Sequence, residues 1–282
     1  MTTRKPIEKS VARGDAEVRR ALRLRILSAA VLIPPVILAI FWGGRLFTAM
    51  VAFAAMLMVF EWTRMVEGRA YSWRFYLLSA SAAAALIAAS AGAYLFALGV
   101  AALGGLLVLA PIGGFTMWPA IAAPYIVAPS VALIWLRFDP VYGGALTALV
   151  FITVWAADTG AFIFGKLLGG PKISYALSPS KTWAGIGGGV AGGALMGAAG
   201  AYFFFGPGAA LGFLLPGGIL GAASVAGDLA ESALKRRFRV KDISGFIPGH
   251  GGVLDRLDGM IFATVTMTSV YLLYTLFGKL QG

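Results

Sequence analysis

The stretch from Ser232 to Asp258, SALKRRFRVKDISGFIPGHGGVLDRLD, separates two long apolar segments in the last third of the chain. It holds six Lys or Arg residues and three Asp, whereas only 12% of the 282 residues are charged and 59% are hydrophobic. Charged side chains are costly near hydrocarbon, so a dense run of both signs between apolar segments indicates a functional site. The apolar segments themselves indicate the fold.

Composition places the chain among polytopic helical membrane proteins. Its mean hydropathy is +0.85, and several apolar runs are as long as a membrane-spanning helix requires. The sequence has no Cys and a single His, which excludes disulfides, thiolate ligands and a His-rich metal cluster. Any metal site must therefore use oxygen ligands.

Apolar length, with breaks at charged residues, Pro and Gly, predicts an all-α transmembrane bundle of about nine spans. The predicted spans are 26–43, 46–63, 75–91, 94–111, 115–136, 142–165, 183–205, 208–234 and 254–278. Gly and Pro are frequent in 92–125, which leaves room for a kinked or re-entrant segment. We divide the chain into a basic N-terminal tail (1–25), scaffold helices (26–140) and a catalytic half with two polar loops (141–282).

The net charge of +11 would suggest nucleic-acid binding in a soluble protein, but here the basic residues follow the topology. With nine spans, the tail and both polar loops of the second half fall on one side, which the positive-inside rule makes cytoplasmic. We therefore expect a cytoplasmic N-terminus and no nucleic-acid partner. The tail lacks a signal-peptide cleavage pattern, and we interpret it as a retained segment attracted to anionic lipid headgroups.

Acidic residues gather where the last two predicted spans meet the polar loop. Asp228, Glu231 and Lys235 have the spacing of one helix face, and Asp255 and Asp258 share a face at the start of the last span. If the two helix ends adjoin, these carboxylates converge and need a cation among them, for which oxygen ligands favour Mg²⁺. The alternative is simple pairing with the nearby basic residues Lys235, Arg236 and Arg256.

A glycine cluster, Pro248-Gly249-His250-Gly251-Gly252, directly precedes the last span. Glycines allow backbone N–H groups to approach an anion closely, and the helix N-terminus adds positive potential, so the cluster suits a phosphate. A glycine cluster before a helix also marks ordinary turns. His250 fits a hydrogen-bonded structural role better than that of an acid or base.

A second polar element runs from Asp158, inside a predicted span, to Thr182. Its end, Ser178-Pro179-Ser180-Lys181-Thr182, leads into the span 183–205. Ser or Thr at a helix start caps the helix and can donate to an anion, while Lys181 adds a point charge. The Gly-Lys frame of a P-loop is absent. A capped helix start with a cytoplasmic lysine explains this element equally well.

These residues resemble the signature of the phosphatidate cytidylyltransferase (CDP-diacylglycerol synthase) family. The resemblance rests on Ser232-x-Leu234-Lys235-Arg236, Lys241-Asp242 and His250-Gly251-Gly252-Val253-x-Asp255-Arg256-Leu257-Asp258. Ser178-Pro179-x-Lys181-Thr182 and Asp158 are similar to the second polar segment of the family. The resemblance is specific over roughly 155–260 and general before that.

The resemblance implies conversion of CTP and phosphatidate to CDP-diacylglycerol and pyrophosphate at the cytoplasmic face of a bacterial inner membrane. It implies a homodimer and Mg²⁺, with or without a second, monovalent cation such as K⁺. Asp228 and Asp255 match metal ligands, and with Lys235 and Asp258 they form the expected catalytic set. The residues that match substrate-binding positions are Ser178, Lys181, Thr182, Arg236, Lys241, His250, Gly251, Gly252 and Arg256. Asp158, Glu231 and Ser232 are additional candidates.

Two other functions are compatible with a cytoplasmic site that has a hard cation, phosphate-binding side chains and apolar walls. A CTP-dependent lipid or polyprenol kinase needs the same cation, triphosphate and membrane acceptor. A transporter is less favoured, because transport predicts polar residues near mid-membrane and these cluster at one boundary.

Overall fold

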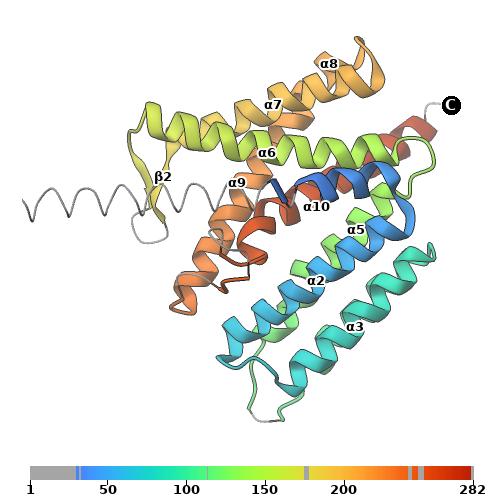
Figure 1. The fold of residues 1–282 in the computed structure, drawn as a ribbon, viewed down its shortest axis with the longest axis vertical. Helices are drawn as coiled ribbons and strands as arrows, with labels where there is room; N and C mark the ends of the chain where they lie inside the picture. The colour runs from blue at the N-terminus through green and yellow to red at the C-terminus, as the bar shows by residue number, and fades with distance from the viewer. Residues whose placement is uncertain are drawn as a thin grey trace, which may run out of the picture.

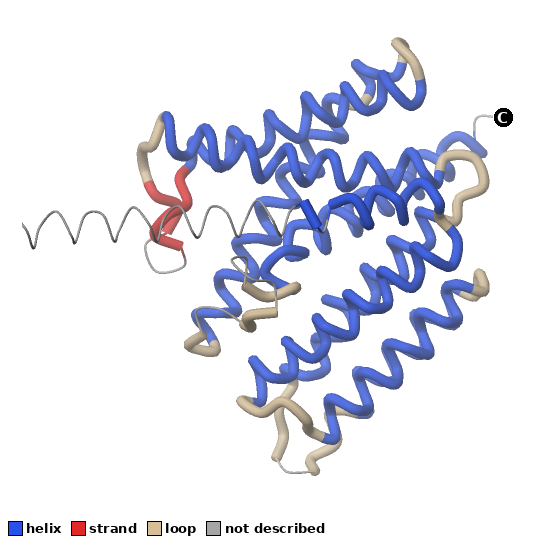
Figure 2. The backbone as a smooth tube through the Cα atoms, viewed as in Figure 1, coloured by secondary structure: helices blue, strands red, loops and turns tan. Residues whose placement is uncertain are grey.

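The computed structural model describes residues 30–31, 33–112, 114–174, 178–240, 243–246 and 251–280, without the side chains of 179 and 277–280. Most of this chain is helical (Figure 2). The start of α10, the end of α9 and strand β2 lie toward one end of the bundle, and α8 lies at the other (Figure 1). Two of the proposed site residues, Lys241 and His250, lie outside the described residues.

Apolar helices occupy each of the predicted span positions. A short helix over Ile33–Trp42 is followed by α2 (Gly44–Glu67), α3 (Trp73–Ser90), α4 (Tyr94–Leu107), α5 (Ala128–Arg137), α6 (Gly143–Leu167), α7 (Trp183–Phe205), α8 (Ala209–Gly212), α9 (Leu214–Arg237) and α10 (Leu254–Leu280). Within the described part of the chain, seven helical segments are long and apolar enough to cross a membrane. A helical membrane bundle is therefore confirmed, while the count of nine and the side of the N-terminus stay predictions.

The Pro-rich segment before α5 is irregular helix, in a region where the frequent Gly and Pro predicted a break in the regular pattern. After α4 the chain forms a 3₁₀ helix, η1 (Trp118–Ile121), and then a π-helical turn, η2 (Ala123–Val127), that continues into α5. Pro119, Pro124 and Pro129 each lack an N–H donor, so a regular α-helical ladder cannot run through them.

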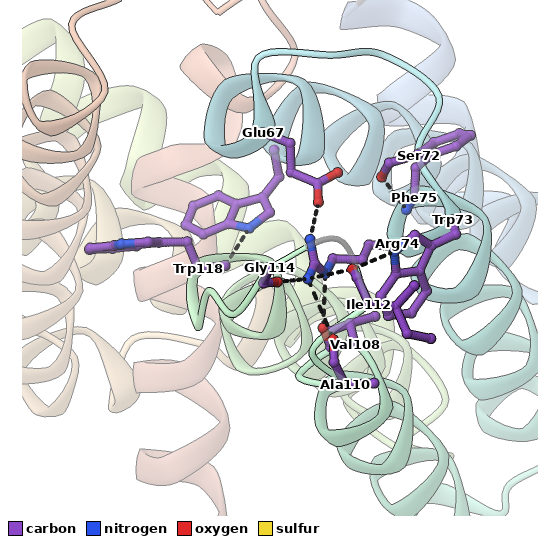
Figure 3. A network of polar contacts seen from close by, with 11 residues as sticks. Glu67, Ser72, Trp73, Arg74, Phe75, Val108, Ala110, Ile112, Gly114 and Trp118 are labelled. Atoms are coloured by element: carbon purple, nitrogen blue, oxygen red, sulfur yellow. Dashed lines mark hydrogen bonds and ion pairs between the residues drawn. The ribbon is translucent and has the colours of Figure 1, made fainter.

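Arg74 at the start of α3 holds the segment that follows α4 (Figure 3). Its buried guanidinium forms an ion pair with Glu67 at 2.9 Å and donates to the carbonyl oxygens of Val108 at 3.0 Å and Gly114 at 2.6 Å. Carbonyl groups past the end of a helix have no partner in the helix itself, and Arg74 supplies one. This network fixes the end of the bundle at which α2 terminates.

Glycines let α7 pack directly against its neighbours. A Cβ atom on Gly193 would lie 2.7 Å from the carbonyl oxygen of Gly217 on α9, and one on Gly217 would lie 2.6 Å from that of Gly193. Small residues allow such close backbone approach in membrane helices. The packing brings α9, which carries Asp228, beside α7, which directly follows the strand that carries Lys181.

The loop before α7 contains a β-hairpin that the all-α prediction missed. Strands β1 (Lys172–Ser174) and β2 (Ser178–Thr182) pair antiparallel, with Lys172 opposite Thr182. The strands are too short for a periodic signal in the sequence. The predicted cap is confirmed, because the Thr182 hydroxyl accepts a hydrogen bond from the Gly185 N–H at 3.1 Å.

Candidate functional site

The end of α9 and the start of α10 lie side by side, which is the condition for a shared site. The two helices run antiparallel, so that the backbone of Asp258 lies against Gly227 and that of Gly259 against Ser224. A side chain at either glycine would collide with the opposite helix. The polar faces of both helices therefore meet at the end of the bundle.

Lys235 forms ion pairs with two buried acids at this junction. Its Nζ lies 2.8 Å from Glu231 Oε2 and 3.0 Å from Asp255 Oδ1, and the two acidic side chains are only 4% and 5% exposed. The sequence left two possibilities for these acids, a bound cation or simple ion pairs with basic residues. In this triad the acids form ion pairs. Arg236 and Arg256 have exposed side chains.

Asp228 has a different environment one turn away. Its side chain is 43% exposed and forms an ion pair of 3.0 Å with Lys181, at the end of β2. Its carboxyl group also lies within hydrogen-bonding reach of Asp258, which is 6% exposed. Two carboxyl groups in such contact must share a proton or a cation. Of the acids at the junction, this pair is where a cation would be most stabilising.

Asp158 on α6 completes the open side of the site. Ser224 donates to its Oδ1 at 3.4 Å, and its carboxyl group interacts electrostatically with Asp228, Lys181 and Arg256. Asp158 and Arg256 are exposed, as Asp228 is in part. Asp158, Asp228 and Arg256 thus lie on an open face, backed by the buried triad of Lys235 with Glu231 and Asp255. Lys181 joins this face through its ion pair with Asp228, with its Nζ buried.

The two glycines of the signature are explained by contacts with carboxylates. Gly251 has a φ of +86°, and a Cβ atom there would lie 2.9 Å from Asp255 Oδ2. The Gly252 N–H donates to the same oxygen at 2.9 Å, in the manner of a capping box. A positive φ and close approach both favour glycine. In this structure the N–H of Gly252 therefore donates to Asp255, whereas the sequence predicted a phosphate as its partner.

Glu61 on α2 reaches the same loop from the half of the chain that we assigned to the scaffold. Its carboxylate accepts hydrogen bonds from the N–H groups of Val253 at 2.9 Å and Leu254 at 2.7 Å, and from the Ser244 hydroxyl. The side chain is fully buried. Sequence reasoning missed this contact; the one available signal was an acidic residue within a predicted span.

The remaining candidates lie around this centre. Ser178 is buried, and its hydroxyl lies 3.4 Å from that of Ser180 on the same strand. Thr182 is committed to capping α7. Ser232 is half-buried on α9, next to Glu231.

The carboxylates offer the oxygen chemistry of a magnesium site without forming a complete one. Among the described residues, no group of three or more Asp, Glu or His side chains is arranged to hold a metal ion. Mg²⁺ commonly takes only one or two protein carboxylates, with the remaining ligands from substrate phosphates and water. The Asp228 and Asp258 pair fits that pattern, and Asp255 lies one turn away on α10.

The fold and the site together define a polytopic helical membrane protein with a charged site at the junction of α6, α9 and α10. The chain belongs to the cytidylyltransferase family, whose family model matches residues 23–276.

Several relatives are phosphatidate cytidylyltransferases. The protein of Brucella suis biovar 1 is 39% identical over 150 residues, which cover 53% of this chain and 55% of the relative. That of a Synechocystis species is 45% identical over 120 residues, covering 43% and 41%. The chain thus spans about half the length of these two relatives. The protein of Rickettsia bellii is 30% identical over 261 residues, covering 90% and 92%.

Proposed function

We propose that this protein transfers the cytidylyl group of CTP to phosphatidate, giving CDP-diacylglycerol and pyrophosphate. The observation that carries the proposal is the open face on which Asp228 lies between Lys181 and Asp258, at the ends of two membrane helices. Such a face suits a triphosphate with its cation beside an acceptor held in the bilayer. Membership of the cytidylyltransferase family and the names of the matched relatives support the same reaction.

The reaction needs no nucleophile from the protein. A phosphate oxygen of phosphatidate attacks the α-phosphorus of CTP in line. The bond from that phosphorus to the oxygen bridging it to the β-phosphorus breaks, and pyrophosphate leaves with the bond's electrons. Positioning and charge neutralisation supply most of the rate enhancement in such transfers.

Basic residues at the open face are assigned to the phosphates. Lys181 and Arg256 flank the acids from β2 and α10, where they would neutralise the triphosphate and the departing pyrophosphate. Lys235 would hold Asp255 and Glu231 in place. The resemblance to the family supports substrate contacts for the other signature residues, which are Ser178, Thr182, Arg236, Lys241, His250, Gly251 and Gly252.

Asp228 and Asp255 would hold Mg²⁺, with Asp258 as the carboxylate nearest to Asp228. When bound, the ion supplies neutralisation of the charge on the triphosphate. The support is the oxygen-only donor set and the contact between two carboxyl groups. A second, monovalent cation such as K⁺ is proposed from the resemblance alone.

The location and assembly of the protein are also proposals. The basic loops favour a site on the cytoplasmic face of a bacterial inner membrane. Large exposed apolar side chains such as Leu95 and Phe203 suit contact with lipid tails, and the acyl chains of phosphatidate would remain in the bilayer. A homodimer is proposed from the family resemblance.

The test is the identity of the products. Purified protein in detergent is incubated with CTP, phosphatidate and Mg²⁺, and the lipid is analysed by mass spectrometry. A lipid heavier than phosphatidate by one cytidylyl group, together with pyrophosphate, is expected. A lipid heavier by one phosphoryl group, with release of CDP, would instead identify a kinase, and CTP that stays unconverted with every lipid or polyprenol offered would revive a transporter.

A further inference from the structure

Glu61 joins the two ends of the loop that carries the glycine signature. The Ser244 hydroxyl donates to its Oε1 from one end of the loop. From the other end, the Val253 N–H donates to Oε1 at 2.9 Å and the Leu254 N–H donates to Oε2 at 2.7 Å. A single carboxylate from α2 therefore joins Ser244 to the start of α10.

The contacts of Glu61 are all with the protein, at the start of α10 and at Ser244. Both of its oxygens accept hydrogen bonds from the protein, and the side chain is 0% exposed. A buried carboxylate needs such donors, and the N-terminus of a helix is a favourable place for negative charge. Glu61 is thus fully engaged in holding the chain at the start of α10.

Aromatic rings reinforce the same contact between the halves. Phe60, adjacent to Glu61, places its ring 5.5 Å from that of Phe246 in the loop. Tyr71 and Phe75 lie 5.6 Å and 5.8 Å from Phe60 on its other sides. Such ring clusters favour defined relative orientations. The loop is therefore seated on the end of α2 by polar and apolar contacts together.

The position of Glu61 is transmitted to Asp255 through the glycines. A Cβ atom on Gly252 would lie 2.8 Å from Glu61 Oε1, so the carboxylate fits only against glycine. The N–H of the same Gly252 donates to Asp255 Oδ2. Glu61 therefore determines where α10 begins. The start of α10 in turn sets the positions of Asp255 and Asp258 along the facing helix α9.

We propose that Glu61 is a positioning residue for nucleotidyl transfer, acting through its contacts with Ser244, Val253 and Leu254 to hold Asp255 and Asp258 against Asp228. This role rests on the proposed function. The segment assigned to the scaffold thus contributes to the geometry of the site, although Glu61 itself touches no substrate.

The test compares Glu61→Gln with Glu67→Gln in the full-length protein. Glutamine at 61 puts an NH₂ group where a backbone N–H needs an acceptor. We expect amide deuterium exchange in peptides covering 243–256 to accelerate about tenfold, with exchange in α6 and α7 unchanged. We also expect the KM for CTP to rise with that for phosphatidate unchanged, since the acids that Glu61 positions are assigned to the cation that accompanies the triphosphate.

Glu67→Gln is the matched control, because Glu67 is a buried acid on the same helix whose partner is Arg74. We expect it to lower thermal stability without selective exchange in the loop or a change in the KM for CTP. If amide exchange is fast throughout Glu61→Gln, that variant is unfolded, and Ser244→Ala is used in its place. Ser244→Ala removes one hydrogen-bond donor to Glu61 and keeps the carboxylate. Faster exchange confined to 243–256 in Ser244→Ala would support the proposal.

Unchanged exchange of the loop in a folded Glu61→Gln, or in Ser244→Ala where that variant decides, would overturn the positioning role. An unchanged KM for CTP alongside faster exchange would do the same. Wild-type protein that makes no CDP-diacylglycerol would overturn the proposed function instead. Exchange is measured without nucleotide, so the two failures are distinguishable.

Discussion

Asp228 on α9 and Asp258 on α10 lie within hydrogen-bonding reach of each other, at the point where Gly227 lets the two helices touch. Asp258 is buried, whereas the side chain of Asp228 is 43% exposed and also contacts Lys181. The exposed member of the pair can meet a ligand from solution while the buried member stays fixed.

Asp255→Asn should abolish turnover while leaving the protein folded. Asparagine keeps an oxygen for the Gly252 N–H but loses the charge that pairs with Lys235 and that a cation would require. A loss of at least about hundredfold in kcat is expected, similar to removal of one electrostatic group from other active sites. Rates are measured in detergent, with gel filtration as the test of folding. Near-normal activity would refute the assignment of Asp255 to the metal.

Lys235→Met should cost much more stability than Lys181→Met. Removal of Lys235 leaves Glu231 and Asp255 buried without a counter-ion, which is expected to cost about 3–5 kcal/mol of stability. The pair of Lys181 with Asp228 is more exposed, so its loss should cost about 1 kcal/mol at most. Thermal unfolding in detergent measures both.

Activity separates the same two lysines at a temperature where both variants are folded. Lys181→Met should lose turnover out of proportion to its small loss of stability, because Lys181 is assigned to the phosphates. A Lys181→Met variant that is as unstable as Lys235→Met but fully active would contradict the division into open and buried sides.

Two glycines on α7 should respond to Ala with opposite signs. A Cβ atom on Gly193 would press on the backbone of α9, so Gly193→Ala is expected to destabilise by about 1–3 kcal/mol. Gly187 has nothing within 4 Å of such an atom, and Gly187→Ala should be neutral or stabilise by up to about 1 kcal/mol through helix propensity. Equal melting temperatures for the two variants would argue against the close packing of α7 and α9.

Asp139, in the loop between α5 and α6, gives a pH-dependent contribution to stability. Burial opposes ionisation, but hydrogen bonds from the Tyr271 hydroxyl and the N–H groups of Tyr142 and Val141 outweigh it and lower the pKa of Asp139. A lowered pKa in the folded state stabilises the fold above the unfolded pKa of about 3.9, and this contribution disappears as pH falls below it. The melting temperatures of wild type and Asp139→Asn should therefore converge on acidification from neutral pH. A difference that widens instead would contradict this.

The sequence predicted features that depend on local pattern. Apolar length located the helices, the Ser/Thr rule located the cap at Thr182, and the spacing of Asp228, Glu231 and Lys235 predicted their common face. Each of these signals lies within one element. Two contacts between α9 and α10 also followed from the sequence: the convergence of carboxylates, seen for Asp228 and Asp258, and the ion pair of Lys235 with Asp255.

Contacts between distant segments could not be predicted in the same way. Glu61 is 192 residues from Val253, and nothing near it indicates a partner. Lys181 meets Asp228 only because glycines bring α7 against α9, and the partner glycines are not specified by either helix alone. The hairpin β1–β2 was taken as loop because a three-residue strand carries no usable alternation.

The most direct test of the account is transfer of label from CTP labelled at the α-phosphorus, with wild type and Asp228→Asn compared across a Mg²⁺ titration. We predict that wild type places the label on the lipid in a Mg²⁺-dependent manner. Asp228→Asn should retain the thermal stability of wild type and transfer at least about hundredfold more slowly. Label that stays in the aqueous products, or a variant that transfers as fast as wild type at every Mg²⁺ concentration, would contradict the claim that these helix ends hold the cation and its triphosphate.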